Sequence, residues 1–183
     1  MKIQKILLTM LCVALAAACL CACATDNSVE GRMKAIEQSI KDVRRYTAEL
    51  TINDVSADKT TTVYSYKAEY AKADDGFDAT VTEGEFSRNF AFEKTTSSRK
   101  VATIVVPVAV AEENIVGYSY KDGKFTCLVN ADKLAEVLKL SQGAPVGNAT
   151  LTCVFDKDKA QTITCNFQTT DGKDVTYAYA FEY

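Results

Sequence analysis

Residues 116–129, VGYSYKDGKFTCLV, carry the clearest structural signal in this chain. Asp122-Gly123 is typical of a type I′ turn, because that turn needs a positive φ at both of its central residues. All the inward side chains of the two flanking strands then share one face, so the turn and the hydrophobic pattern agree on one register. The predicted facing pairs are Tyr120 with Phe125, Tyr118 with Cys127, and Val116 with Val129.

The same alternation of apolar and polar residues continues on both sides of this hairpin, as expected for strands with one buried face. Before the hairpin, the alternating positions are Tyr46, Ala48, Leu50, Ile52; Tyr64, Tyr66, Ala68, Tyr70; Phe77, Ala79, Val81; and Phe86, Phe90, Phe92. After it, they are Leu151, Cys153, Phe155; Ile163, Cys165, Phe167; and Val175, Tyr177, Tyr179, Phe181, Tyr183. This pattern predicts a large antiparallel sheet with one apolar face.

Two loops set the expected register of the last three strands. A turn at residues 158–160 would pair Cys153 with Cys165, Phe155 with Ile163, and Leu151 with Phe167. A loop at residues 170–172, with Gly172 in the left-handed conformation, would set Phe167 beside Val175 on the apolar face. A shorter loop at Asp171-Gly172 is rejected, because it would place Phe167 opposite Thr176.

Two segments have helical periodicity. Asn27 and Glu30 have the spacing of a capping box, and a helix is expected from there to about Arg45. Its apolar stripe is Val29, Met33, Ile36, Ile40 and Val43, and its polar face is Arg32, Lys34, Glu37, Lys41 and Asp42. A second helix is expected over residues 131–141, with Asn130 as its N-cap and Gly143 as its stop.

The expected fold class is therefore α+β. A large curved antiparallel sheet, a half-barrel of about 8–10 strands, would be covered by the N-terminal helix and by the second helix near residues 131–141. The apolar run 101–111 is expected to be buried on both faces or under a lid, and to bend or lie at an edge at Pro107. Residues 29–183 are expected to form a single domain.

The amino terminus resembles a bacterial export signal. Lys2 and Lys5 precede an uncharged stretch from Ile6 to Thr25, and the first acidic residue is Asp26. Its end, Leu20-Cys21-Ala22-Cys23, resembles the lipobox of bacterial lipoproteins, in which the final cysteine is acylated. The resemblance implies a signal peptide over residues 1–22, an acyl anchor such as palmitate on Cys23, and a short tether over residues 23–28.

Two alternatives to this processing remain open. Ala16-Ala17-Ala18-Cys19 would make Cys19 the acylated residue, although it lacks the aliphatic first position. An uncleaved membrane helix is the other, since a spanning helix needs about 20 apolar residues. Each of these readings holds the domain on the extracytoplasmic face of the cell membrane.

Composition argues against several classes of function. Removing Lys2 and Lys5 changes the net charge from −3 to −5, and nucleic-acid binding needs a basic footprint instead. The chain has no His, which removes the commonest general base and metal ligand. The acidic pairs at 74–75, 83/85 and 112–113 are interpreted as a solvated rim. We expect no enzyme activity, no metal site and no cofactor.

Three cysteines remain outside the signal region: Cys127, Cys153 and Cys165. In the expected register Cys153 and Cys165 face each other closely enough for a cross-strand disulfide. Free thiols in the core are the favoured alternative, because free cysteine is commonly buried and the count is odd.

The aromatic residues of the predicted inward face have two interpretations. They could form a packed core, or they could line a cavity between the sheet and its helices. The candidate lining residues from the strands are Tyr66, Tyr118, Tyr177 and Tyr179.

The order of elements resembles the LolA/LppX superfamily of bacterial lipoprotein-associated proteins. The matching segments are residues 28–45, the strand Tyr46-Thr-Ala-Glu-Leu-Thr-Ile52, and the end of the C-terminal meander, Tyr177-Ala-Tyr-Ala-Phe181. Members have an unclosed β-barrel whose concave face is covered by helices, and several carry acyl chains or lipids. The resemblance implies that Met33, Ile36 and Ile40 face such a cavity.

Two hypotheses for function follow. The first is a membrane-anchored, extracytoplasmic lipoprotein that binds a lipid or other hydrophobic ligand. The second is a structural or protein-interaction lipoprotein with a solid core and no small ligand.

Overall fold

A computed structural model describes residues 26–56, 59–86, 91–103, 112–130, 133 and 145–183. Within these residues there is one α-helix, one short 3₁₀ helix and nine strands. The helices are α2 (Val29–Ile40) and η1 (Glu112–Asn114). The strands are β1 (Arg45–Ser56), β2 (Lys59–Ala73), β3 (Gly76–Phe86), β4 (Phe92–Val101), β5 (Ile115–Lys121), β6 (Lys124–Val129), β7 (Pro145–Asp156), β8 (Lys159–Thr169) and β9 (Lys173–Glu182).

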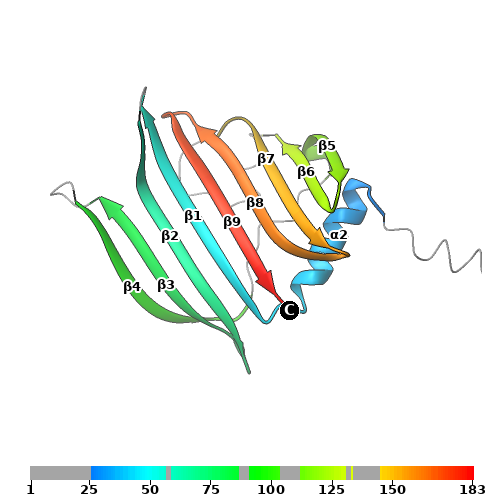
Figure 1. The fold of residues 1–183 in the computed structure, drawn as a ribbon, viewed down its shortest axis with the longest axis horizontal. Helices are drawn as coiled ribbons and strands as arrows, with labels where there is room; N and C mark the ends of the chain where they lie inside the picture. The colour runs from blue at the N-terminus through cyan, green and yellow to red at the C-terminus, as the bar shows by residue number, and fades with distance from the viewer. Residues whose placement is uncertain (1–25, 57–58, 87–90, 104–111, 131–132, 134–144) are drawn as a thin grey trace, which may run out of the picture.

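All nine strands form one antiparallel sheet in the order β4-β3-β2-β1-β9-β8-β7-β6-β5 (Figure 1). Strands that follow one another along the chain are paired, except that β4 and β5 lie at opposite edges of the sheet. At the centre, β1 pairs with β9 over residues 45–54 and 173–182. The strand count agrees with the expected large antiparallel sheet. The two halves of the sheet are therefore two meanders joined by the β1–β9 pairing.

The sheet is strongly one-sided. One face, here the helix-side face, contains Tyr46, Ala48, Leu50 and Ile52 of β1 and their cross-strand neighbours, and it holds most of the buried core. The opposite, outer face has hydroxyl side chains in cross-strand rows, such as Thr126, Thr152 and Thr164. Successive side chains of a strand point to opposite faces of the sheet. The alternation of apolar and polar residues in the sequence therefore gives one apolar face and one face of hydroxyl and charged groups.

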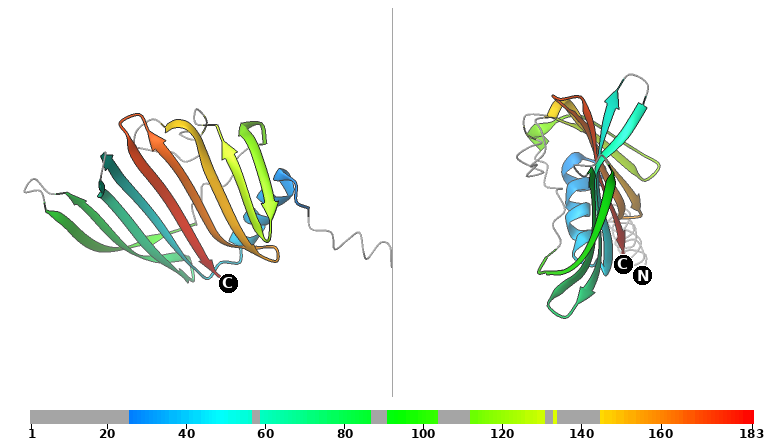
Figure 2. Two further views of the ribbon diagram at one scale, coloured as in Figure 1. Left: turned by 45° about the horizontal axis from the view of Figure 1, so that its top comes forward. Right: turned by 90° about the vertical axis from the view of Figure 1, so that its left-hand side faces the viewer.

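Helix α2 packs against β8 on the helix-side face (Figure 2). Its N-cap is Ser28, whose Oγ accepts a hydrogen bond from the Gly31 amide at 3.0 Å, so the cap lies one residue beyond the predicted Asn27. The helix ends at Ile40 rather than near Arg45, because Arg45 already begins β1. The predicted apolar stripe is confirmed as far as the helix extends, because Val29, Met33 and Ile36 are buried and Ile40 packs against the core. Val43 is also buried, but it lies beyond the end of the helix.

The prediction that Arg32 lies on the polar face of the helix is wrong. Its side chain is buried, and its guanidinium carbon lies 4.9 Å from the ring centroid of Tyr120 and 5.1 Å from that of Phe155. Long basic side chains can cover apolar surface while their charge contacts aromatic faces. Arg32 thus belongs to the contact between the helix and the sheet.

The expected α+β fold with two covering helices is also wrong, because nearly all of the described chain is antiparallel strand and α2 is the single α-helix there. Apart from Lys133, the predicted helix over residues 131–141 lies outside the described residues, as does most of the run 101–111. Beyond α2, aromatic side chains cover part of the helix-side face themselves: the Tyr46 and Tyr70 rings stack at 4.1 Å, and Phe77 meets Tyr46 edge-on at 5.6 Å.

The quoted hairpin is confirmed at its turn and in two of its three pairs. Asp122 and Gly123 have φ of 51° and 75°, Tyr120 faces Phe125, and Tyr118 faces Cys127. The third pair is wrong, because a bulge between Ile115 and Gly117 places Ile115 opposite Val129. The bulged residue, Val116, is 61% exposed.

The last loop is confirmed in full. Residues 170–172 join β8 to β9, Gly172 has a φ of 77°, and Phe167 faces Val175. The requirement that Phe167 and its partner lie on the same apolar face therefore selected the correct loop length.

Candidate functional site

A pocket lined mainly by tyrosines lies on the helix-side face, over the central strands. Its volume is about 260 Å³. The lining residues, which define the tyrosine pocket, are Ala48, Glu49, Leu50, Tyr64, Tyr66, Glu83, Arg99, Tyr177 and Tyr179. They come from strands β9, β1, β2, β3 and β4, so the pocket crosses the pairing that joins the two meanders.

Small side chains at adjacent positions explain why a pocket forms here. Ala48 of β1 faces Ala68 of β2 on one side and Tyr179 of β9 on the other. The next row on the same face is bulky, with Leu50 between Tyr66 and Tyr177. Side chains stand roughly perpendicular to a sheet, so a row of alanines beside a row of large residues leaves a depression.

Hydrogen bonds order one end of the pocket. Arg99 of β4 donates from Nη2 to the Tyr66 hydroxyl at 2.6 Å, and the Tyr66 and Tyr70 hydroxyls are 3.1 Å apart. The Arg99 guanidinium carbon also lies 6.0 Å from the Tyr66 ring centroid. Burial, followed by the hydrogen bond with Tyr70, raises the pKa of Tyr66 above its ordinary value, which favours the neutral form of this hydroxyl.

A smaller hollow of about 140 Å³ adjoins the tyrosine pocket and shares Tyr64 and Glu83 with it. Its lining is Tyr64, Glu83, Glu85, Glu93 and Thr95. Glu85 directly faces Glu93 across the β3–β4 pair, and Glu83 lies two residues along on the same face. Burial first, and then the negative charges of Glu83 and Glu85, raise the pKa of the Tyr64 hydroxyl. We call this second hollow the acidic extension.

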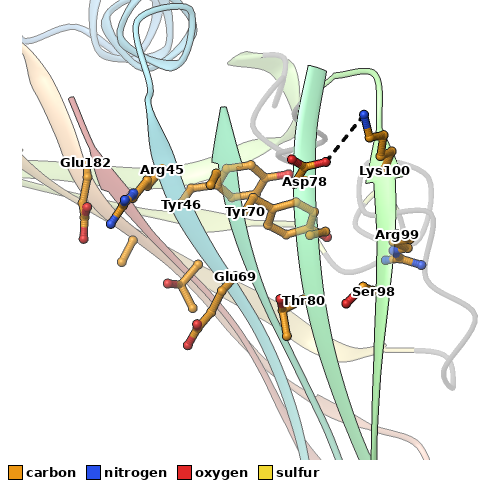
Figure 3. A pocket seen from close by; sticks show the side chains of 14 residues that line it. Arg45, Tyr46, Glu69, Tyr70, Asp78, Thr80, Ser98, Arg99, Lys100 and Glu182 are labelled. Atoms are coloured by element: carbon orange, nitrogen blue, oxygen red, sulfur yellow. Dashed lines mark ion pairs between the residues drawn. The ribbon is translucent and has the colours of Figure 1, made fainter. Parts of the chain in front are cut away.

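A larger hollow of about 910 Å³ is lined mostly by side chains of the outer face (Figure 3). Charged groups of both signs cross it in one row, in which Arg45 faces Glu182 and Asp78 faces Lys100. The Asp78 carboxylate lies 3.9 Å from the Lys100 ammonium group, and both side chains are exposed. Its greater size does not make it the better site, because exposed and mutually paired charges offer a ligand little that water does not.

Three of the predicted lining residues meet in the tyrosine pocket: Tyr66, Tyr177 and Tyr179. The other four are elsewhere. Met33 and Ile36 are buried in the core, Ile40 packs beside it, and Tyr118 is 54% exposed on the edge strand β5. That any of these residues contacts a ligand stays a prediction.

Six residues of the pocket wall were not predicted from the sequence: Ala48, Leu50, Tyr64, Glu83, Arg99 and the outer-face residue Glu49. The first three were placed on the inward face but were not singled out. Glu83 and Arg99 follow from the register, since Glu83 faces Tyr66 and Arg99 faces Ala79, which in turn faces Tyr70. The usable signal was a charged residue at an inward position of an alternating strand.

The register that suggested a disulfide is wrong. Asp156 pairs with Lys159 around a turn in which Lys157 has a φ of 57°, and a bulge follows between Val154 and Phe155. Cys153 therefore faces Ile163, and Cys165 faces Leu151. Cys127, Cys153 and Cys165 are all free and buried.

These thiols make stability depend on pH. Burial raises the pKa of Cys127, Cys153 and Cys165 to about 12, from an ordinary value of 9.0. The folded state therefore holds these protons more tightly than the unfolded state, so the contribution is complete below pH 9 and is lost as pH rises toward 12. Urea unfolding between pH 8 and 11 should give a falling free energy of unfolding. A constant or rising value would contradict this expectation, and replacing the three cysteines with alanine should reduce the slope.

Among the described residues, no group of three or more His, Cys, Asp or Glu side chains is placed to hold a metal ion. None of the helices in that part of the chain is both long and apolar enough to cross a membrane. Residues 1–25, which include Cys19 and Cys23, lie outside the described residues.

Comparison with known proteins adds little. No family model matches the chain, and no curated protein matches it. A redesigned β barrel, mFAP1, bound to DFHBI, is 11% identical, with 73% of this chain and 91% of that chain covered and a TM-score of 0.20. An isomerase-inactive variant of GphF DH1 is 10% identical, with 85% and 81% covered and a TM-score of 0.21. The first of these proteins is a β barrel, and the similarity of this chain to it is weak. TM-scores this low carry no argument about function, and neither match concerns the LolA/LppX superfamily.

Proposed function

We propose that this chain is a membrane-anchored, extracytoplasmic lipoprotein that binds a hydrophobic or amphiphilic ligand in the tyrosine pocket. The observation that carries the proposal is the pocket itself: four tyrosines, Leu50 and Ala48 surround a depression on the apolar face of the sheet. Aromatic walls with a few polar groups are usual for small-molecule sites. The lipobox-like segment ending at Cys23 supports the anchor.

The size of the pocket limits the ligand. At about 30 Å³ per water molecule, 260 Å³ corresponds to roughly nine waters. That volume suits one ring system or a short length of acyl chain better than a whole two-chain phospholipid. Each methylene transferred from water would contribute about 0.8 kcal/mol. A lipid ligand would therefore insert only part of itself.

The polar groups suit a ligand with two kinds of surface. The Tyr66 hydroxyl and Arg99 stand at one end of the pocket, and Glu83 stands where the acidic extension begins. Such groups fix the orientation of a ligand whose affinity comes from apolar contact. No group in the lining is arranged as a nucleophile with an adjacent base, so binding without chemistry is the proposed role.

Filling the pocket from its floor should abolish binding. Ala48→Phe places a ring in the depression and should weaken binding of the neutral probe N-phenyl-1-naphthylamine at least about tenfold. Fluorescence titration of the mature domain measures this, and circular dichroism checks that the variant is folded. Ala180→Phe is the matched control, because Ala180 is exposed on the outer face of the same sheet, opposite Thr47, and neither residue lines the tyrosine pocket.

Equal affinity of the Ala48→Phe variant and the unmodified protein would contradict the proposed site. Native mass spectrometry of protein purified from membranes gives a second readout. A bare protein mass together with no probe binding would favour the solid-core interaction lipoprotein instead.

A further inference from the structure

We propose that two copies of this chain pair antiparallel through the free edge of β4, with Thr96 of each copy opposite Thr96 of the other. The sheet then continues from one copy into the next, and the helix-side faces of both copies lie on the same side. This inference goes beyond the proposed ligand and does not depend on it, because the tyrosine pocket is formed within one chain.

The two edges of the sheet differ in how open they are to another strand. β4 and β5 are the edge strands, and no described residue pairs with the outer side of either. β5 has seven residues and a bulge between Ile115 and Gly117, and a short, bulged strand is a usual way to blunt an edge. β4 has ten residues in unbroken register with β3, and residues 93–100 are all exposed. A long regular edge with a row of open backbone donors and acceptors is a template for another strand.

The two faces of β4 restrict how a second strand can pair with it. Directly opposite residues must share a face, because otherwise the apolar face of one copy would continue into the outer face of the other. The registers that satisfy this condition differ by steps of two residues. The helix-side residues of β4 are Glu93, Thr95, Ser97, Arg99 and Val101, and the outer-face residues are Phe92, Lys94, Thr96, Ser98 and Lys100.

One of these registers matches the charges of the strand. With Thr96 at the two-fold axis, Glu93 of each copy faces Arg99 of the other. Two opposite-charge pairs therefore form on the helix-side face, and such cross-strand pairs are stabilising. On the outer face, Lys94 and Lys100 each meet an uncharged residue of the second copy. No two like charges are directly opposite in this register.

The neighbouring registers are worse. Moving the axis to Ser97 places Lys94 of each copy opposite Lys100 of the other, and like charges directly opposite are destabilising. Moving it to Thr95 leaves Arg99 opposite a residue beyond the end of β4. Charged residues on an edge strand usually prevent uncontrolled pairing. On β4 they prevent it in these registers and favour the register centred on Thr96.

The pair between Glu93 and Arg99 can form only between copies. The two residues are six positions apart on one strand, which separates them by about 20 Å within a chain. Arg99 donates from Nη2 to the Tyr66 hydroxyl at 2.6 Å, and Glu83 lines the same pocket. A guanidinium has five N–H donors, so Arg99 can keep its bond to Tyr66 and still meet the carboxylate of the second copy.

Oxidative crosslinking of the full chain in membranes tests the register. Thr96→Cys should give a disulfide-linked dimer well above the level of the unmodified chain, because directly opposite Cα atoms lie about 4.5–5.5 Å apart. Ser98→Cys is the matched control on the same face, since Ser98 would lie about 13 Å along the strand from Ser98 of the other copy. No excess dimer with Thr96→Cys, or equal dimer with both variants, would overturn the proposed pairing.

Charge reversal in the Thr96→Cys background tests the ion pairs. Glu93→Arg should lower the crosslinked fraction at least about fivefold, because two arginines would then face each other across the edge. The reciprocal change E93R/R99E should restore crosslinking, which a folding defect would not do. Glu182→Arg, at an exposed position of β9, is the control and should change nothing. A fraction that Glu93→Arg leaves unchanged, or that the reciprocal change does not restore, would overturn the pairing. Probe binding to Ala48→Phe remains a separate test of the pocket.

Discussion

Arg32→Ala is expected to lower the free energy of unfolding by about 3 kcal/mol, the range for removing a large, fully buried side chain. Arg32 is 2% exposed and lies over both Tyr120 and Phe155. Its Nε also donates to the backbone oxygen of Asp26 at 2.8 Å. Alanine would remove the two ring contacts and this hydrogen bond, and it would leave a cavity between α2 and the sheet. Urea unfolding followed by circular dichroism measures the change.

Arg32→Met separates the packing of this side chain from its charge. The Nη1 atom of Arg32 is buried with no hydrogen-bond partner among the described residues. Its Nη2 lies 3.8 Å from the carboxylate of Asp158, which is 69% exposed. Replacing an incompletely paired buried charge by an apolar side chain of similar size is often neutral or stabilising. Methionine should therefore restore most of the stability that alanine loses.

The exposed residue Arg44 provides the control for this pair of variants, and Arg44→Ala should change the free energy of unfolding by less than about 0.5 kcal/mol. If Arg32→Ala unfolds at the same urea concentration as the unmodified protein, the buried guanidinium contributes nothing to the helix–sheet contact. If methionine proves as damaging as alanine, the charge itself stabilises the fold.

Cys23→Ala is expected to abolish acylation and to move the protein from the membrane fraction to the soluble or unprocessed fractions. A single acyl chain binds membranes only marginally, whereas several chains anchor durably, at about 0.8 kcal/mol per buried methylene. Labelling with palmitate and fractionation measure both effects. Cys19→Ala is the matched variant and should keep label and location. Label that persists in Cys23→Ala and disappears in Cys19→Ala would assign the anchor to Cys19.

The sheet was largely predictable because turn chemistry and side-chain alternation constrain each other. Asp122-Gly123 fixed one hairpin, and the requirement that Phe167 share a face with Val175 selected the loop around Gly172. Tyr66, Tyr177 and Tyr179 of the pocket were identified for the same reason. Alternate residues of a strand lie on the same face, so one known inward residue identifies the others.

The errors also have a physical basis. Moving one strand by two residues keeps every side chain on its face, so alternation could not distinguish Cys153 opposite Cys165 from Cys153 opposite Ile163. The register of β7 against β8 depends on the turn between them, in which Lys157 has the left-handed conformation. Glycine or asparagine at that position would have indicated such a turn, whereas lysine does not. Arg32 was misplaced because an arginine is expected to be solvated, and only the neighbouring rings of Tyr120 and Phe155 explain its burial.

The pairing of β1 with β9 has a consequence for the order in which the molecule assembles. Each meander can grow hairpin by hairpin, but the seam between them closes a loop of roughly 120 residues, from Asp54 to Lys173, which is entropically slow. A chain emerging amino end first would keep one edge of β1 unpaired until residues 173–182 arrived. The tyrosine pocket straddles that seam, with Ala48 and Leu50 on one side and Tyr177 and Tyr179 on the other. Ligand capture would therefore begin only when the last strand is in place, so an occupied pocket would mark a fully folded chain.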